Sequence, residues 1–303
     1  MTDLPGGTGL IRYTNSEGSV VNFQYGPPFH ITGREGFEAV ENEIITDVQS
    51  DMDGEILLGT RAQKRDLLLE AVLIGETIED RYNLRRELIK VLSPKLTGTL
   101  TYFVPNGKEY EIDVVPQSTT FTDFTMSDST LNQYDQVSIR WVAADPYWRD
   151  ISIYNSLISL SQVDNQFVFP LVIPSGGFVF ASIRSGEIKT VENNGDVEVG
   201  GIFSLKVYTR CKNPRIFNIL TGEYFGFIGE YEVGTILTVN SQRNQKKVTK
   251  TMDGISVNAM PERDPNSTFL LIRKGQNHFQ IQCDEGVSGT IGTLEFKPLV
   301  IGV

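Results

Sequence analysis

The chain has 303 residues, of which 40% are hydrophobic and 21% charged, and its formal net charge at pH 7 is −11. This length suffices for two ordinary domains, each with its own core. The acidic excess argues against binding nucleic acid by counterion release, which needs clustered lysine and arginine. No window approaches the about 18 uninterrupted apolar residues of a membrane span, so no membrane insertion is expected.

The first half of the chain predicts strands around a single helix. Residues 65–75 are almost continuously apolar, as in a buried strand. A helix is expected at about 77–92, with Thr77 as its cap and Ser93-Pro94 as its stop. Helical spacing places five apolar residues on the face expected to pack against the core: Ile78, Tyr82, Leu88, Ile89 and Leu92.

Two further strand patterns complete this half. Residues 100–115 alternate polar and apolar positions around Asn106-Gly107, which predicts a hairpin. Residues 136–144 alternate in the same way and place Trp141 on the buried face. The first half is therefore expected to be α+β, with mostly antiparallel strands and one helix laid across them.

Beyond residue 150 no stretch has a helix pattern. Short alternating runs separated by turn residues predict an antiparallel sandwich or barrel, and they cover 202–210, 235–240, 278–283 and 292–301. The change of pattern predicts an N-terminal domain at 1–150, a connection at 151–168 and a C-terminal β-sandwich at 169–303.

The sequence offers little for catalysis. Its only histidines, His30 and His278, fall in different predicted domains, so neither a histidine triad nor a zinc site is expected. Nucleophile-elbow, phosphate-loop and dinucleotide-binding glycine motifs are missing from the sequence. A glycosidase would need a facing pair of carboxylates, and nothing among the 38 acidic residues nominates one. We therefore expect no enzymatic activity and no cofactor.

Metal binding is not expected either. Residues 49–60 match three positions of an EF-hand loop but lack its first and last ligands, so a polar excursion between strands is favoured over a calcium site. Cys211 and Cys283 are far apart in the sequence and in no ligand-spaced pair. Two buried, reduced thiols are favoured over a disulfide or a metal site.

The segment Asp145, Pro146, Tyr147 and Trp148, here called the closing segment, admits two interpretations. It is either a binding or catalytic cluster or the point where the first domain ends. Pro146 has no N–H for a ladder and biases Asp145 toward extended backbone, so regular pairing should stop there. Tyr147 and Trp148 would then cover the end of the first core, with their polar tips reaching partners. Structural closure is the favoured interpretation.

The order of these elements resembles the siphophage distal tail protein family. The resemblance rests on five elements: a strand, a helix ending in proline, a Leu-x-Tyr hairpin, a second strand and an Asp-Pro-Tyr-Trp terminus. They lie at 65–75, 81–94, 98–115, 136–144 and 145–148, respectively. A looser likeness to the family's galectin-like sandwich covers 191–207, 213–225 and 274–281. The latter departs from the family at Lys274-Gly275-Gln276, where Pro-Gly often precedes the asparagine.

This resemblance implies a structural virion protein with a split-barrel-like, ring-forming first domain and a galectin-like second one. Members form a homohexameric hub at the distal end of the phage tail, made and assembled in the host cytoplasm. The implied partners are further copies of itself, the tail tube protein, the tail-tip or hub protein, and receptor-binding or baseplate proteins. DNA passes only in transit through the central channel.

The resemblance also gives a use for the long excursion at 41–60. Its mixture of polar and apolar residues suits pairing with a neighbouring subunit, whereas an ordinary hairpin packed on its own domain is the alternative. The candidate intersubunit residues are Ile44, Ile45, Val48, Met52 and Ile56.

The alternative function is a carbohydrate-binding module that attaches to the host surface through the C-terminal sandwich. Sugar binding needs a shallow groove with an exposed aromatic side chain and polar neighbours, and fold alone does not establish it. Residues of suitable type are Arg210, Asn218, Tyr224 and His278.

Overall fold

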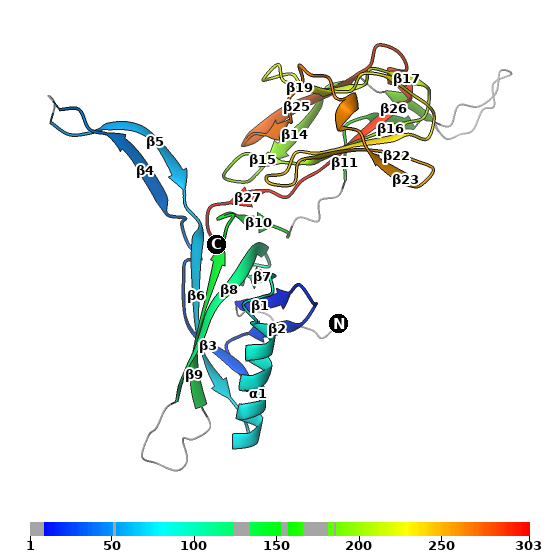
Figure 1. The fold of residues 1–303 in the computed structure, drawn as a ribbon. Helices are drawn as coiled ribbons and strands as arrows, with labels where there is room; N and C mark the ends of the chain where they lie inside the picture. Colours follow the sequence, from blue (N-terminus) through cyan, green and yellow to red (C-terminus); the bar gives the residue numbers. More distant parts are fainter. Residues whose placement is uncertain (1–8, 51–52, 124–133, 153–156, 166–180, 185) are drawn as a thin grey trace. The chain divides into compact units, whose positions relative to one another are not determined.

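The computed structural model describes residues 9–50, 53–123, 134–152, 157–165, 181–184 and 186–303. The chain divides into two compact units (Figure 1), one of residues 1–153 with 299–303 and the other of residues 154–298. The first unit therefore includes five residues that the sequence assigned to the second domain. The second unit begins inside the predicted connection at 151–168, where two short strands already lie.

The first unit is built on a sheet whose strands follow the order β2-β1-β7-β8-β9-β6-β3, with β10 beside β8 and β27 beside β10. These strands are β1 (Leu10–Asn15), β2 (Val20–Phe23), β3 (Phe29–Glu35), β6 (Arg65–Ile74), β7 (Gly98–Phe103), β8 (Glu109–Asp123), β9 (Tyr134–Ala143), β10 (Trp148–Asp150) and β27 (Leu299–Val300). All neighbouring strands in this order are antiparallel. Within the described residues the sheet does not close into the predicted split barrel. Its two end strands, β2 and β3, are connected only by an isolated bridge between Gln24, which follows β2, and His30 in β3.

Alternation in the central strands creates the core of this unit. On β6 and β9 every second side chain is almost fully buried, and these residues are Leu67, Leu69, Ala71, Leu73, Val137, Ile139, Trp141 and Ala143. The register pairs Leu69 with Ile139 and Leu67 with Trp141, so both apolar sets lie on the same face. The predicted hairpin and the predicted burial of Trp141 are confirmed.

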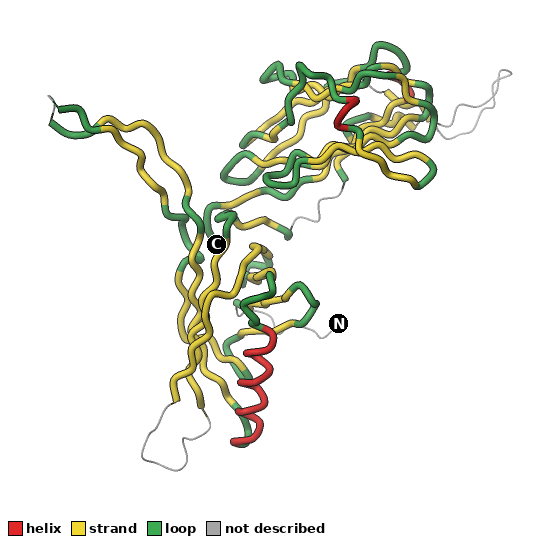
Figure 2. The backbone as a smooth tube through the Cα atoms, in the orientation of Figure 1, coloured by secondary structure: helices red, strands yellow, loops and turns green. Residues whose placement is uncertain are grey.

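The helix α1 (Ile78–Val91) is the one α-helix of the described chain (Figure 2), and its position is as predicted. Thr77 and Asp80 form a capping box: the Thr77 hydroxyl accepts from the Asp80 N–H, and the Asp80 carboxylate accepts from the Thr77 N–H. The prediction of its buried face was only partly right. The side chains of Leu88, Val91 and Leu92 enter the core, with Leu84 packed against it.

The excursion between β3 and β6 is a separate two-stranded hairpin of β4 (Asn42–Asp47) and β5 (Ile56–Ala62). Figure 1 shows this hairpin extending beyond the point where β6 begins. We call residues 42–62 the arm.

The second unit contains two principal antiparallel sheets, one ordered β11-β26-β16-β21-β22-β23 and the other β14-β25-β18-β19. The first has β11 (Ile158–Ser159), β16 (Ile202–Val207), β21 (Ile236–Asn240), β22 (Lys247–Met252), β23 (Ile255–Asn258) and β26 (Thr290–Glu295). The second has β14 (Lys189–Asn193), β18 (Arg215–Asn218), β19 (Tyr224–Gly226) and β25 (Gly275–Gln282). Phe203 on one sheet meets Phe279 on the other edge-to-face, with ring centroids 5.5 Å apart. The two sheets thus bury a shared apolar layer.

Short two-stranded pairs complete the second unit. They are β12 (Gln162–Asn165) with β13 (Ala181–Arg184), β15 (Val199–Gly200) with β24 (Leu271–Ile272), and β17 (Cys211–Lys212) with β20 (Glu230–Tyr231). Two 3-10 turns occur at Met260–Glu262 and Val287–Gly289. The mainly-β prediction is confirmed for the chain as described.

The predicted strand at 292–301 is in fact two strands. β26 ends at Glu295 in the second unit, and β27 begins at Leu299 in the first. Pro298 lies between them, and a proline has no N–H to continue a ladder.

Candidate functional site

The closing segment lies at the end of the first unit's core. β9 stops at Ala143, and pairing resumes only at Trp148 in β10. Trp148 is fully buried and its ring lies 5.4 Å from that of Phe37. The backbone of β10 pairs with β8 on one side and with β27 on the other, where Trp148 faces Val300.

One detail of the closing segment differs from the prediction. The indole N–H of Trp148 is buried and meets no acceptor among the described residues, so its polar tip does not reach a partner there. The contribution of this tryptophan is consequently apolar and aromatic burial.

Arg65, at the start of β6, is buried beside the closing segment and forms hydrogen bonds to several backbone carbonyls. Its guanidinium donates to the carbonyl oxygen of Pro146 at 2.7 Å, and to those of Gly36 and Glu38 at 2.6 and 2.9 Å. It also donates to the carbonyl of Ile301. Burial lowers the pKa of Arg65, and the Glu38 carboxylate partly opposes that effect. Because arginine still stays protonated in proteins, one buried cation binds four carbonyls from three other segments of the chain.

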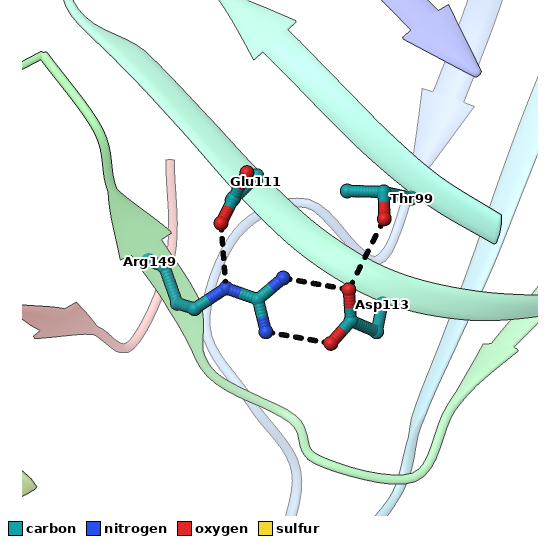
Figure 3. A network of polar contacts seen from close by, with 4 residues as sticks. All are labelled: Thr99, Glu111, Asp113 and Arg149. Atoms are coloured by element: carbon teal, nitrogen blue, oxygen red, sulfur yellow. Dashed lines mark hydrogen bonds and ion pairs between the residues drawn. The ribbon is translucent and has the colours of Figure 1, made fainter. Parts of the chain in front are cut away.

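A second arginine, Arg149 in β10, binds two carboxylates of the neighbouring strand β8 (Figure 3). Arg149 donates two hydrogen bonds to Asp113, at 2.6 and 2.7 Å, and its Nε donates to Glu111 at 2.9 Å. The Thr99 hydroxyl donates to the same Asp113 at 3.2 Å. Burial alone would lower the pKa of Arg149, but its hydrogen bonds and the nearby charges of Asp113 and Glu111 raise it. The cluster is a fork-to-fork ion pair across two strands rather than an acid–base site.

Replacing Arg149 by methionine is expected to lower the free energy of unfolding of the first unit by about 1–2 kcal/mol. The change removes three charge-assisted hydrogen bonds and leaves Glu111 and Asp113 as unbalanced neighbours on β8. Urea titrations followed by tryptophan fluorescence measure the loss. The loss should shrink at about 1 M salt because screening weakens the carboxylate repulsion. A loss that does not change with salt would contradict the electrostatic explanation.

The arm presents apolar side chains to solvent. Of the predicted arm residues, Ile44 is 67% exposed, Val48 69%, and Ile45 and Ile56 43% each, whereas Met52 lies outside the described residues. The prediction missed Leu57 and Leu58, which are 62% and 64% exposed. The sequence could have indicated them, because they belong to the apolar run Ile56-Leu57-Leu58 that begins β5.

The helix carries a second exposed apolar surface. Ile78, Tyr82 and Ile89 are 54%, 61% and 52% exposed, and their spacing places them on one side of α1. We call these three residues the helix stripe. The prediction that they face the core is therefore wrong. The core contacts come from an adjacent side of the helix, which includes Leu88 and Val91.

Three of the four residues considered for sugar binding are buried or held by neighbouring side chains. Asn218 is 1% exposed and points inward from β18. Tyr224 stacks on Phe217 with centroids 5.7 Å apart, on the opposite face of that sheet. Arg210 is ion-paired with Glu230.

A hollow of about 260 Å³ does lie beside Tyr224, lined also by Asn213, Arg215, Gly226, Phe227, Ile228 and Asp264. The polar side chains that line it form hydrogen bonds or ion pairs with each other or with nearby residues. The Tyr224 hydroxyl donates to Asp264 at 2.8 Å, and Arg215 is paired with Asp284. These contacts account for the polar lining without a ligand.

The described residues show no group of three or more His, Cys, Asp or Glu side chains placed to hold a metal ion. Nor does any helix among them have the length and apolarity to cross a membrane.

Comparisons with known proteins find similarity to phage tail proteins. Residues 16–132 match the family described as Phage tail protein RIFT-related domain. The distal tail protein Dit of phage SPP1, described as a paradigm of the hub adsorption apparatus in phages infecting Gram-positive hosts, has a similar fold. That match has a TM-score of 0.65 at 11% identity and covers 94% of this chain and 98% of the SPP1 chain.

A chain of the phage P2 baseplate in its activated conformation with Ca has a TM-score of 0.51 at 12% identity, covering 95% of this chain and 97% of that one. No curated protein sequence matches the chain. The resemblance predicted from the sequence is thereby confirmed: residues 16–132 match the phage tail protein family, and the chain has a fold similar to that of SPP1 Dit.

Proposed function

We propose that the protein is a structural component of the phage virion, a non-enzymatic hub at the distal end of the tail. In this proposal copies of the chain close into a homohexameric ring that joins the tail tube to the tip or baseplate, beside the receptor-binding proteins. DNA crosses the central channel without being held, which suits a chain of net charge −11. Assembly takes place in the host cytoplasm. The family match and the fold shared with SPP1 Dit over nearly the whole chain support this role.

The observation that carries the ring is the pair of exposed apolar surfaces on the first unit. A ring of identical subunits needs two different surfaces on each copy, one of which fits the other on the next copy. The arm and the helix stripe are two such surfaces, and both expose large aliphatic side chains. Isolated exposed residues need no explanation, but clusters of this kind mark contact sites.

Charge supports pairing between these two surfaces. Besides its apolar residues the arm carries five acidic residues against the single basic residue Arg61, and these are Glu43, Asp47, Asp51, Asp53 and Glu55. On one side the helix stripe is bordered by Arg86, Lys90 and Glu79, all exposed, so the basic residues there outnumber the acidic one. We therefore assign the arm of one copy to the helix stripe of its neighbour, where unlike charges surround the apolar contact.

The test is the mass of the protein in solution and the appearance of its particles. Light scattering after size exclusion should give a hexamer, and electron microscopy should show six-fold rings. The double variant Leu57→Asp, Leu58→Asp should be monomeric with an unchanged melting temperature, since both side chains are solvent-exposed in the single copy. Leu220→Asp, in a residue 61% exposed on the second unit, is the matched control and should still form rings.

The outcomes separate the two parts of the proposal. A wild-type protein that stays monomeric at high concentration and shows no rings would contradict the hub. Rings that persist in the arm variant would leave the hub standing and remove the arm from the contact.

A further inference from the structure

The two cysteines are distant in the sequence and adjacent in space. Cys211 opens β17, Cys283 directly follows β25, and their sulfur atoms lie 3.2 Å apart although the residues are 72 positions apart. Both are free thiols in the structure. The chain has no other cysteine, so each has one partner available.

The backbone holds this pair in register. The Lys212 N–H donates to the Glu285 carbonyl at 3.0 Å, and the Asp284 N–H donates to the Lys212 carbonyl at 2.9 Å. Residues that immediately follow the two cysteines are thus tied to each other. A disulfide bond is about 2.05 Å long, so roughly 1 Å of sulfur movement would suffice, which small side-chain rotations supply.

The thiols also differ in environment. Cys211 is fully buried, whereas Cys283 is partly exposed as a residue and is therefore the cysteine nearer to solvent. The hydrogen bond between the sulfurs lowers the pKa of Cys211 to about 7 and raises that of Cys283, because the last proton is held between the two sulfurs. The pair therefore loses its first proton more readily than an ordinary cysteine does, and the thiolate is the reactive form of cysteine.

We propose that Cys211 and Cys283 form an intramolecular disulfide when the protein moves from a reducing to an oxidising medium. With oxidised glutathione as the oxidant, proton transfer between the sulfurs places the thiolate on Cys283. This thiolate attacks glutathione disulfide, forming a mixed disulfide and releasing one glutathione thiolate. Cys211 then loses its proton to solvent and attacks the Cys283 sulfur, releasing the second glutathione. The two protein thiols lose two electrons, and one glutathione disulfide gains them.

The expected consequence is a more stable second unit. The bond would close a loop of about 70 residues and restrict the unfolded chain. For a unit of this size we expect its melting temperature to rise by roughly 5–15 °C on oxidation. The first unit contains both tryptophans and neither cysteine, so its own transition, followed by fluorescence, serves as an internal reference.

The experiment uses the full-length protein equilibrated with a series of reduced-to-oxidised glutathione ratios. Free thiols are then alkylated after denaturation in acid, and peptides are mapped by mass spectrometry. The expected result is a cross-linked peptide pair joining Cys211 to Cys283 within one chain, with a raised calorimetric transition for the second unit only. Cys283→Ser is the matched variant: it keeps the buried Cys211 and should show no such rise.

Two results would overturn the inference. One is that both cysteines are still free thiols, and so are alkylated, after equilibration in excess oxidised glutathione, or that they cross-link different chains. The other is that Cys283→Ser shows the same rise of the second unit's melting temperature on oxidation as the wild type, which would mean that the rise does not come from this bond. Neither result depends on whether the protein assembles into a ring.

Discussion

Replacing Trp148 by alanine should lower the free energy of unfolding of the first unit by about 3–5 kcal/mol. The side chain is fully buried in the main apolar core, where it contacts Phe37. Its loss leaves a cavity beneath β10, the strand that pairs with both β8 and β27. Urea unfolding followed by the fluorescence of Trp141, the tryptophan that remains, measures the change in the first unit.

Two further variants make this result specific. Trp148→Phe keeps an aromatic ring in the site and should cost less than the alanine change, roughly 1–3 kcal/mol. Tyr25→Ala removes an aromatic ring that is 56% exposed and should stay within about 0.5 kcal/mol of the wild type. If Trp148→Ala costs no more than Tyr25→Ala, the closing segment does not complete the core.

Replacing Arg65 by methionine should destabilise the first unit by about 2–4 kcal/mol. Methionine fills much of the space but leaves the carbonyls of Gly36, Glu38, Pro146 and Ile301 without their shared donor. The effect should extend along the chain to residues 299–303. There the Val303 N–H, which donates to the Phe37 carbonyl at 2.9 Å, should exchange its hydrogen faster.

Hydrogen exchange read by mass spectrometry on a peptide containing 299–303 tests this expectation. Arg65→Lys should remain impaired, because a lysine ammonium has three donors and no planar fork with which to reach four carbonyls. Arg61→Met is the control, since Arg61 is 72% exposed in an ion pair with Glu43 on the arm and should contribute at most about 1 kcal/mol. Unchanged exchange at 299–303 in Arg65→Met would contradict the role assigned to the guanidinium.

The sequence predicted the features that depend on local chemistry. Thr77 and Pro94 bracket the helix because capping and proline geometry act within a few residues. The face that the helix buries was less predictable. Apolar residues occupy more than one side of α1, and only tertiary contacts decide that Leu88 and Val91 go inward while Tyr82 stays outside.

The candidate site depends mostly on long-range contacts, and much of it could not be predicted. Arg65 looks like the ordinary polar start of a strand, and its four carbonyl partners come from other parts of the chain. Sequence spacing likewise separates Cys211 from Cys283, which only the fold brings together. Pro298 was the available signal that the strand predicted at 292–301 is interrupted.

The return of β27 to the first unit affects the order in which the protein is completed during synthesis. Everything that β27 pairs with, and the Arg65 side chain that binds its neighbour Ile301, is made before residue 154. The ribosome must nevertheless translate the whole second unit before this strand exists. At about 5–20 residues per second, the first unit's nascent sheet waits several seconds or more with the edge of β10 unpaired. Unpaired edges invite association with other chains, so this interval is when a chaperone or a neighbouring nascent chain would find the protein most accessible.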